Sequence, residues 1–335
     1  MTTNSLFTHG YALLIGVGGD LPVTVQDATA LRDILIAPQR CAYPPEQVKL
    51  LTKNQADRQG ILDGLDWLIN IVQRDEKATA MVYFSGHGGF TPEYHLLPAG
   101  YDSQKIKKTA ISGTEFTQKL REIRVQKLLI LLDCCYAAGM TTAKAPGFKP
   151  SSFPPELPTV LAQGSGRVFI ASSRQDEVSR TGSPYSVFTQ ALREGLAGYG
   201  TATRDGYAYI ADVALYAGRV VPARTGGKQH PVLDMRHADN FALAYYAGGA
   251  KTPVPLADAQ AILSPLAVVD TGLIESYRAI FRQYQQNLAN VEARMSIFVD
   301  QAVVPLDLER TKEGILQKMA DLETQIQTMA QQQGW

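Results

Sequence analysis

The sequence lacks a long apolar run, an excess of charge of either sign and enough cysteine for a disulfide framework. No stretch of about 18 apolar residues occurs, so we expect no membrane-spanning helix. The 32 basic and 32 acidic residues cancel, which argues against nucleic acid as a main partner. The first ten residues show neither the charged nor the apolar region of a signal peptide. We therefore expect a cytoplasmic protein, in which the three cysteines stay reduced.

Two short apolar runs end in residues that can do chemistry. Residues 127–139 read KLLILLDCCYAAG, and residues 80–89 read AMVYFSGHGG. Each run has the length of a buried central strand, and open α/β sheets bind ligands at the carboxyl ends of their strands. Parallel neighbours that end in His87 and in a cysteine would place an imidazole beside a thiol. That pairing can generate a thiolate nucleophile.

These motifs resemble the caspase-like cysteine peptidases, and within them the metacaspase and bacterial orthocaspase branch. SGHGG precedes LLILLDCCYAAG, and Cys135 follows His87 by 48 positions, close to the spacing of about 50 in caspases. The D-C-C triplet is similar to the metacaspase D-x-C. Further matches are YHLLP, VFIASSRQDE and SVFTQALREGL, so the resemblance covers roughly residues 10–246.

The alternation of short strands and helices predicts a mostly parallel sheet. The expected strands are 11–19, 48–52, 80–84, 128–132, 166–173 and a segment near 230–235; the expected helices are 24–37, 57–74, 112–123, 187–196 and 210–221. Ser112 and Glu115 have the spacing of a helix-capping pair. The glycines of GVGGD lack the third glycine of a dinucleotide motif, so we interpret them as a tight turn. The resemblance implies a caspase-like three-layer α/β sandwich with a six-stranded sheet flanked by helices.

The expected domain organisation is a peptidase domain followed by a helical element. Residues 1–249 form the peptidase domain, with a large-subunit part (1–138), an exposed loop rich in Pro, Ser, Thr and Gly (139–165) and a small-subunit part (166–249). Residues 250–265 form a linker. Apolar residues at spacings of three and four predict an antiparallel helical hairpin over 266–335. This hairpin is expected to self-associate or to dock a regulatory protein.

Cys135 is the predicted nucleophile, and His87 is its acid–base partner. A free cysteine is more often a small buried apolar residue, which is our interpretation of Cys134, whose side chain should point away from that of Cys135. The resemblance implies that the backbone amides of Gly88 and Cys135 form the oxyanion hole. His9, His95, His230 and His237 lack a comparable context and are interpreted as structural.

The resemblance also implies that Asp27 and Asp133 form an acidic S1 pocket, so that the enzyme cleaves after Arg or Lys. The alternatives are that Asp27 is a first-turn carboxylate that complements the helix dipole and that Asp133 forms a turn at a strand end. Arg32 lies nearby in sequence and keeps open a preference for Asp at P1.

The predicted function is that of a cysteine endopeptidase acting on proteins or peptides, and the resemblance implies a bacterial role in signalling, cell death or defence. Lys144 and Lys149 are the candidate self-cleavage sites. We expect no cofactor and little calcium dependence, because a calcium site needs six to eight oxygen ligands. Only Glu93 and Asp102 follow His87 closely, and residues 136–155 contain no acid. The alternative is an inactive caspase-like scaffold that recruits partners through the hairpin.

Overall fold

The computed structural model describes most of the chain and divides it into two compact units. The described residues are 6–90, 93–134, 149–150, 153–154, 157, 166–174, 177, 179–180, 182–201, 204–235, 238–257, 271–296 and 306–332. The first unit is Met1–Ala261, and the second is Ile262–Trp335. No helix within the described ranges is long and apolar enough to cross a membrane.

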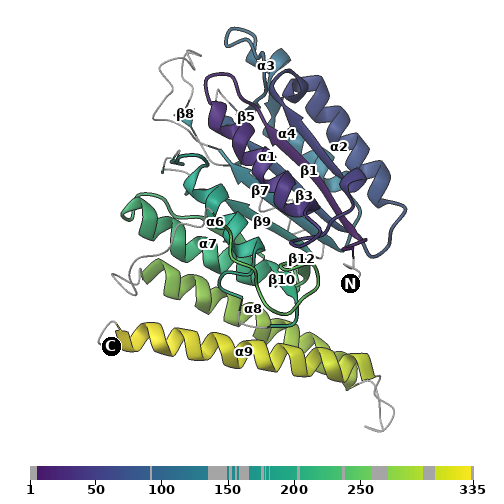
Figure 1. The fold of residues 1–335 in the computed structure, drawn as a ribbon, viewed down its shortest axis with the longest axis vertical. Helices are drawn as coiled ribbons and strands as arrows, with labels where there is room; N and C mark the ends of the chain where they lie inside the picture. Colours follow the sequence, from purple (N-terminus) through teal and green to yellow (C-terminus); the bar gives the residue numbers. More distant parts are fainter. Residues whose placement is uncertain are drawn as a thin grey trace. The chain divides into compact units, whose positions relative to one another are not determined.

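The first unit is built on a six-stranded sheet with the order β11-β9-β7-β3-β1-β2 (Figure 1). Its strands are β1 (Gly10–Gly16), β2 (Val48–Thr52), β3 (Thr79–Ser85), β7 (Lys127–Asp133), β9 (Arg167–Ala171) and β11 (Val232–Asp234). Neighbouring strands are parallel except for β11, which runs antiparallel to β9. The predicted mostly parallel six-stranded sheet is therefore confirmed.

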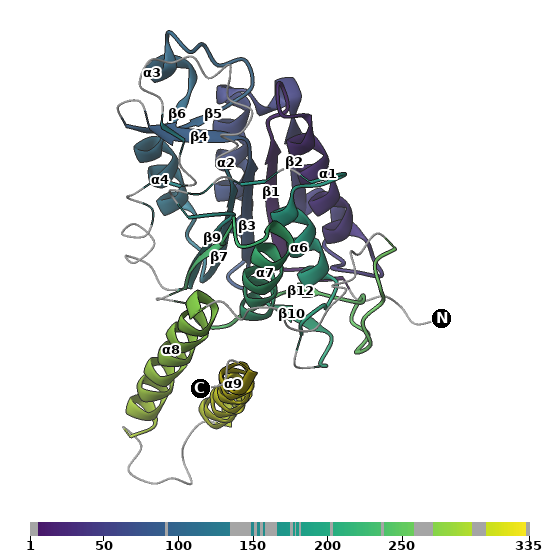
Figure 2. The same ribbon diagram turned by 90° about the vertical axis from the view of Figure 1, so that its left-hand side faces the viewer.

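Helices cover both faces of this sheet. The described helices of the first unit are α1 (Pro22–Ile36), α2 (Arg58–Val72), α3 (Ile106–Thr109), α4 (Gly113–Glu122), α6 (Val187–Leu196) and α7 (Ile210–Thr225), with short 3-10 helices η1 (Pro45–Gln47) and η2 (Lys53–Ala56). Figure 2 shows α2 and α4 on one side of the sheet and α1, α6 and α7 on the other. The predicted cap is confirmed, because the Ser112 hydroxyl accepts a hydrogen bond from the Glu115 amide at the start of α4.

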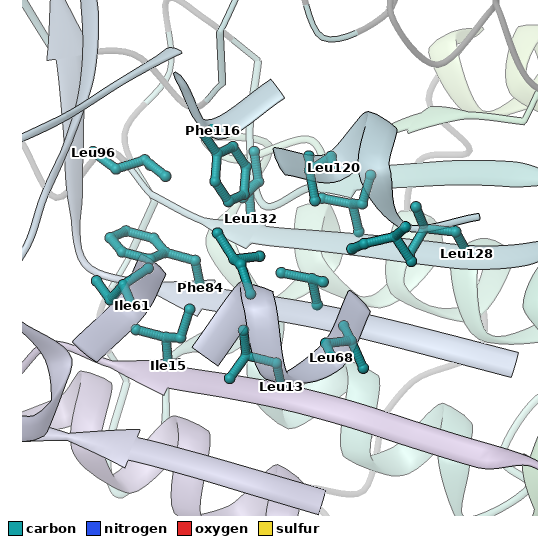
Figure 3. Close-up of a cluster of buried hydrophobic side chains, with 14 of the residues drawn as sticks. Leu13, Ile15, Ile61, Leu68, Phe84, Leu96, Phe116, Leu120, Leu128 and Leu132 are labelled. Carbon is teal, nitrogen blue, oxygen red and sulfur yellow. The ribbon is translucent and has the colours of Figure 1, made fainter. Parts of the chain in front are cut away.

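The strand residues divide between the two faces by their parity, as a pleated strand requires. On β3 and β7, the even-numbered side chains join the apolar cluster beneath α2 and α4 (Figure 3). Its labelled members are Leu13, Ile15, Ile61, Leu68, Phe84, Leu96, Phe116, Leu120, Leu128 and Leu132. Runs of consecutive apolar residues arise because both faces of these strands are covered.

Two smaller sheets complete the first unit. One has the order β6-β5-β4-β8 and contains β4 (His87–Phe90), β5 (Tyr94–Leu97), β6 (Ile111–Ser112) and β8 (Lys149–Pro150). The other pairs β10 (Tyr207–Tyr209) with β12 (Ala242–Tyr245). The first of them matters for function, because β4 begins at His87 and only Gly86 separates it from the end of β3.

The prediction that 139–165 is an exposed loop was wrong at several described positions. The backbone at Lys149 and Pro150 pairs with β4 as strand β8. Phe153 and Leu157 are buried in the apolar cluster, and the Phe153 ring lies 4.9 Å from that of Phe169, centroid to centroid. These two apolar side chains, four residues apart in a Pro- and Ser-rich sequence, therefore belong to the core. Lys144 lies outside the described residues.

The second unit contains α8 (Thr271–Met295) and α9 (Leu306–Gln332), which pack side by side. An ion pair of 2.8 Å joins Glu292, near the end of α8, to Lys312, near the start of α9. This pairing fits an antiparallel hairpin. Its packed positions include Tyr284, Val291, Leu308, Ile315 and Leu322, which repeat at the heptad spacing seen in the sequence.

Candidate active site

The carboxyl ends of β3 and β7 lie side by side, as the two sequence motifs predicted. Ser85 is in register with Asp133, and the Gly86 amide donates a hydrogen bond of 3.3 Å to the Asp133 carbonyl. This register places His87 next to the segment that leads to the predicted nucleophile. Cys135 itself lies outside the described residues.

Cys134 is a packing residue in this structure. Its side chain is fully buried in the apolar cluster beneath α2 and α4, on the same face as Leu132. Asp133, the residue before it, lies on the opposite face among hydroxyl groups. The change of face between adjacent residues is the one that the strand period predicts.

His87 is 4% exposed and begins β4. Its Nε2 lies 3.0 Å from Oδ2 of Asp20, which the turn between β1 and α1 supplies. Its Nδ1 is buried and makes no hydrogen bond with the described residues. The imidazole is therefore held through one nitrogen, while the other has no described partner.

The interpretation of GVGGD as a tight turn did not identify Asp20 as a partner of His87. The turn is present, and Gly18 and Gly19 have φ of +77° and +67°, a conformation that favours glycine. The acid directly after two glycines at the end of a strand was the available signal. Such turns bring a following side chain to the edge where strand ends meet.

Asp27 and Asp133 form a fully buried pair of carboxyl groups. Ser186 joins them, because its amide donates to Asp27 Oδ1 at 2.8 Å and its hydroxyl donates to Asp133 Oδ2 at 2.5 Å. Ser85 donates to Asp27 at 3.4 Å. The pair thus draws together α1, β3, β7 and the start of α6.

Hydroxyl groups satisfy the remaining acceptors of Asp133. Ser179 donates to Oδ1 at 2.8 Å, and Thr189 donates to Oδ2 at 3.2 Å. The sequence analysis did not single out these hydroxyls. The signal for Ser186 was its place before the helical pattern at 187–196, since it caps α6 by accepting from the Thr189 amide at 3.0 Å.

Burial raises the pKa of Asp27 well above its ordinary value, and the nearby charge of Asp133 raises it further. Hydrogen bonds from Ser186 and Ser85 and the charge of Arg193 oppose this shift in smaller measure. Two acids that share one dry site cannot both ionise freely. Asp27 therefore holds its proton more tightly than an isolated carboxylate would.

The alternative interpretations of the two acids do not describe their positions. Asp27 lies beyond the first turn of α1 and is buried, so it is not a first-turn carboxylate that faces solvent. Asp133 accepts hydrogen bonds from residues 46 to 56 positions away, so it joins distant segments of the chain. Arg32 is bound to Asp33 at the surface of α1, whereas the arginine whose charge acts on Asp27 is Arg193.

Three of the other histidines have partners away from this pair. His9 pairs with Asp75 at 2.8 Å, and His230 pairs with Glu177 at 2.6 Å. His95 contacts the Glu93 carbonyl at 2.9 Å through Nδ1. His237 lies outside the described residues. These contacts are those of polar residues that hold loops and strands in place.

The remaining site residues are placed only in part. Gly88 lies in β4 in register with Leu96, one residue after His87. The predicted oxyanion role of its amide stays a prediction. Within the described residues, no group of three or more His, Cys, Asp or Glu side chains is close enough to hold a metal ion.

Comparisons with known proteins give one family and several solved structures. The family model for the caspase domain of C14 peptidases matches residues 9–242. Similar structures include a Geobacter sulfurreducens protein solved as a structural-genomics target (16% identity, TM-score 0.45, covering 72% of this chain and 98% of that one). Another is caspase-1 of Spodoptera frugiperda (15% identity, TM-score 0.43, covering 74% of this chain and 92% of that one). A third is drICE (11% identity, TM-score 0.36, covering 72% of this chain and 98% of that one). A comparison with curated proteins finds no match.

Proposed function

The chain belongs to the caspase-domain family of cysteine peptidases, and from this premise we propose that it is an active endopeptidase that uses His87 and Cys135 and cleaves after Arg or Lys. The observation that carries the proposal is the shared sheet edge at the ends of β3 and β7. There, a buried imidazole whose Nδ1 has no described partner lies beside the segment leading to Cys135, and a buried acid pair lies close by.

The placement of Cys134 supports Cys135 as the nucleophile. Cys134 is fully buried in the apolar cluster, and burial in apolar surroundings disfavours the charged thiolate. Cys41 is also fully buried, and burial raises its pKa beyond the range in which a thiolate forms readily. Of the three cysteines, Cys135 is therefore the one not assigned to packing.

The proposed reaction follows the ordinary chemistry of a thiol and an imidazole. The Cys135 thiolate attacks the scissile carbonyl, and backbone amides such as that of Gly88 stabilise the oxyanion. The imidazolium of His87 gives its proton to the leaving amine as the carbon–nitrogen bond breaks. His87 then takes a proton from water, which hydrolyses the thioester and restores the thiol.

The acid pair supports a basic P1 residue. Asp27 and Asp133 are both buried, so we place them at the base of the S1 pocket and not at its rim. A guanidinium or ammonium there would meet carboxylates that already accept several hydrogen bonds, and binding would release the proton that the pair holds. A P1 carboxylate would meet charge of its own sign, which disfavours the alternative preference for Asp.

Self-cleavage is proposed to occur after Lys144 in preference to Lys149. The backbone at Lys149 is paired with β4, so cleavage there would first require this pairing to open. Lys144 lies outside the described residues. Intact-mass analysis of wild type and Cys135→Ala would locate the cut, and cutting after an Asp would contradict the basic preference.

Kinetics with matched peptide substrates tests the proposed function. We would measure kcat/KM for peptides that differ only in Arg, Lys or Asp at P1, with wild type, His87→Ala and Cys135→Ala, and confirm folding by circular dichroism. Cleavage after Arg or Lys should exceed cleavage after Asp by at least about 100-fold, and both variants should be inactive. Folded, inactive wild type would instead favour a scaffold role.

A further inference from the structure

The His87 imidazole has a carboxylate partner whose role goes beyond the two-residue mechanism proposed above. Asp20 Oδ2 lies 3.0 Å from His87 Nε2. We propose that Asp20 is a positioning residue that fixes the orientation and tautomer of His87 and stabilises its imidazolium form. This inference rests on the proposed function, because it assumes that His87 is the acid–base partner of Cys135.

The backbone holds Asp20 in place for this contact. The Gly18 amide donates to the Thr24 hydroxyl at 2.7 Å, and that hydroxyl donates to the Leu21 carbonyl at 2.8 Å. The Leu21 amide returns a hydrogen bond of 3.2 Å to the Gly18 carbonyl. These bonds close the turn around Asp20 from both sides.

The same turn is joined directly to the strand that leads to His87. The Val17 amide donates to the Ser85 carbonyl at 3.1 Å. Gly86 packs so closely that a Cβ atom there would lie 2.7 Å from Cγ2 of Val17. Asp20 and His87 therefore lie on two segments whose separation is set by a hydrogen bond and by close packing.

The contact through Nε2 decides what Nδ1 can do. An ionised carboxylate can accept hydrogen bonds but cannot donate them. The contact with Asp20 therefore selects the His87 tautomer that carries its hydrogen on Nε2. Nδ1 then carries a lone pair in the neutral ring and can take a proton from a thiol. Nδ1 is buried and has no partner among the described residues, as a nitrogen reserved for the reaction requires.

Other titratable groups around this pair do not replace Asp20. Tyr101 lies close enough for the Asp20 charge to add to the effect of burial, which is the larger cause of its raised pKa. Lys53 passes the turn at Gly18, where its Cγ would lie 3.6 Å from an added Cβ. Asp20 supplies the anion that His87 contacts within the described part of the chain.

The test compares Asp20→Asn with wild type by peptidase kinetics across pH. Asn can turn its amide nitrogen toward Nε2 and select the wrong tautomer, so kcat/KM should fall on the order of tenfold to a hundredfold. The high-pH limb of the profile should move to lower pH, because the variant removes the carboxylate that contacts the His87 ring. The low-pH limb reports ionisation of the Cys135 thiol. It should move less, because His87 is in the imidazolium form both before and after that ionisation.

Two further variants separate positioning from a structural role. Asp20→Glu keeps the charge and should hold the high-pH limb nearer to wild type. Glu93→Gln is the matched control, because Glu93 is another half-exposed acid, 3.8 Å from Nε2 of the buried His95. This control should leave both limbs and kcat/KM within about twofold of wild type.

The outcomes distinguish this inference from the function on which it rests. If His87→Ala is inactive and Asp20→Asn keeps wild-type kinetics and both pH limbs, the positioning role is overturned and the proposed function stands. A loss of rate in Asp20→Asn without any shift of the high-pH limb, and without rescue by Asp20→Glu, would also overturn it. If folded His87→Ala keeps full activity, both proposals fail.

Discussion

The two faces of the six-stranded sheet differ at the ends of the same strands. On the face covered by α2 and α4, Phe84 and Cys134 pack into the apolar cluster. On the face covered by α1 and α6, Ser85 and Asp133 join a buried network of acids and hydroxyls. A shift of one residue along a strand thus separates packing from polar chemistry, and it gives the adjacent cysteines different expected roles.

The largest expected effect comes from replacing each of the two adjacent cysteines by alanine in turn. Cys135→Ala should lower kcat/KM by at least about 10³-fold, because no other group can form the acyl-enzyme. Cys134→Ala should retain activity within about threefold, since it removes only a buried sulfur from the apolar cluster. Kinetics of both folded variants would check this, and the reverse pattern would show that the faces had been assigned the wrong way round.

The polar face can be probed by removing its buried charge. Asp27→Asn keeps an acceptor for the Ser186 amide but cannot ionise. We expect its free energy of unfolding to exceed that of wild type at pH 8 by on the order of 1–2 kcal/mol. Cleavage after Arg or Lys should fall at least about tenfold, because the P1 cation loses a carboxylate.

The pH dependence of this gain has a definite sign. Burial raises the Asp27 pKa above its ordinary 3.8, so the folded protein binds this proton more tightly than the unfolded chain. Wild type therefore loses stability as pH rises from about 4 through the raised pKa, and the gain should grow across that range. Chemical denaturation at pH 5 and pH 8 would check it. Asp33→Asn, at the surface of the same helix, is the control, and an equal gain at both pH values would contradict the account.

A smaller effect, on the free energy of unfolding, is expected from removing the C-terminal part of the chain. Residues 251–256 are tied to the first unit, because Arg40 donates to the Val254 and Pro255 carbonyls and Tyr246 donates to the Lys251 carbonyl at 2.6 Å. A fragment of residues 1–261 should fold and keep peptidase activity. A fragment of 1–249 should be less stable by about 1–2 kcal/mol. Denaturation of both fragments tests this, and aggregation of 1–261 would contradict it.

The smallest expected effect is that of calcium. Added millimolar calcium should change kcat/KM by less than about twofold, because the sequence near His87 and Cys135 offers few of the carboxylates that calcium needs. Titration followed by chelation would measure it. A large activation that a chelator reverses would show that acids outside the described residues gather into a site.

The apolar face was more predictable from the sequence than the polar face. Runs such as Leu128–Leu132 indicate a buried strand by their composition, and the strand period then places Cys134 in the core. The cap at Ser112 depends on neighbours three residues away and was also readable. These features are local, so one stretch of sequence contains all the information that they need.

The polar face depends on contacts between distant segments. Ser179 and Ser186 reach Asp133 across 46 and 53 residues, and no spacing rule relates a serine in one loop to an acid in another. Asp20 meets His87 across 67 residues for the same reason. The burial of Phe153 and Leu157 was not predicted, because Pro and Ser dominate the sequence around them.

The central claim is that Cys135 is a nucleophile activated by His87 in front of an acidic S1 pocket. The most direct measurement is labelling with a peptidyl acyloxymethyl ketone that carries Arg at P1, followed by peptide mapping of all three cysteines. The account predicts a single label, on Cys135. Labelling should be lost in His87→Ala, and an otherwise identical probe with Asp at P1 should not label the protein. A label on Cys134, or equal labelling by the Asp probe, would contradict it.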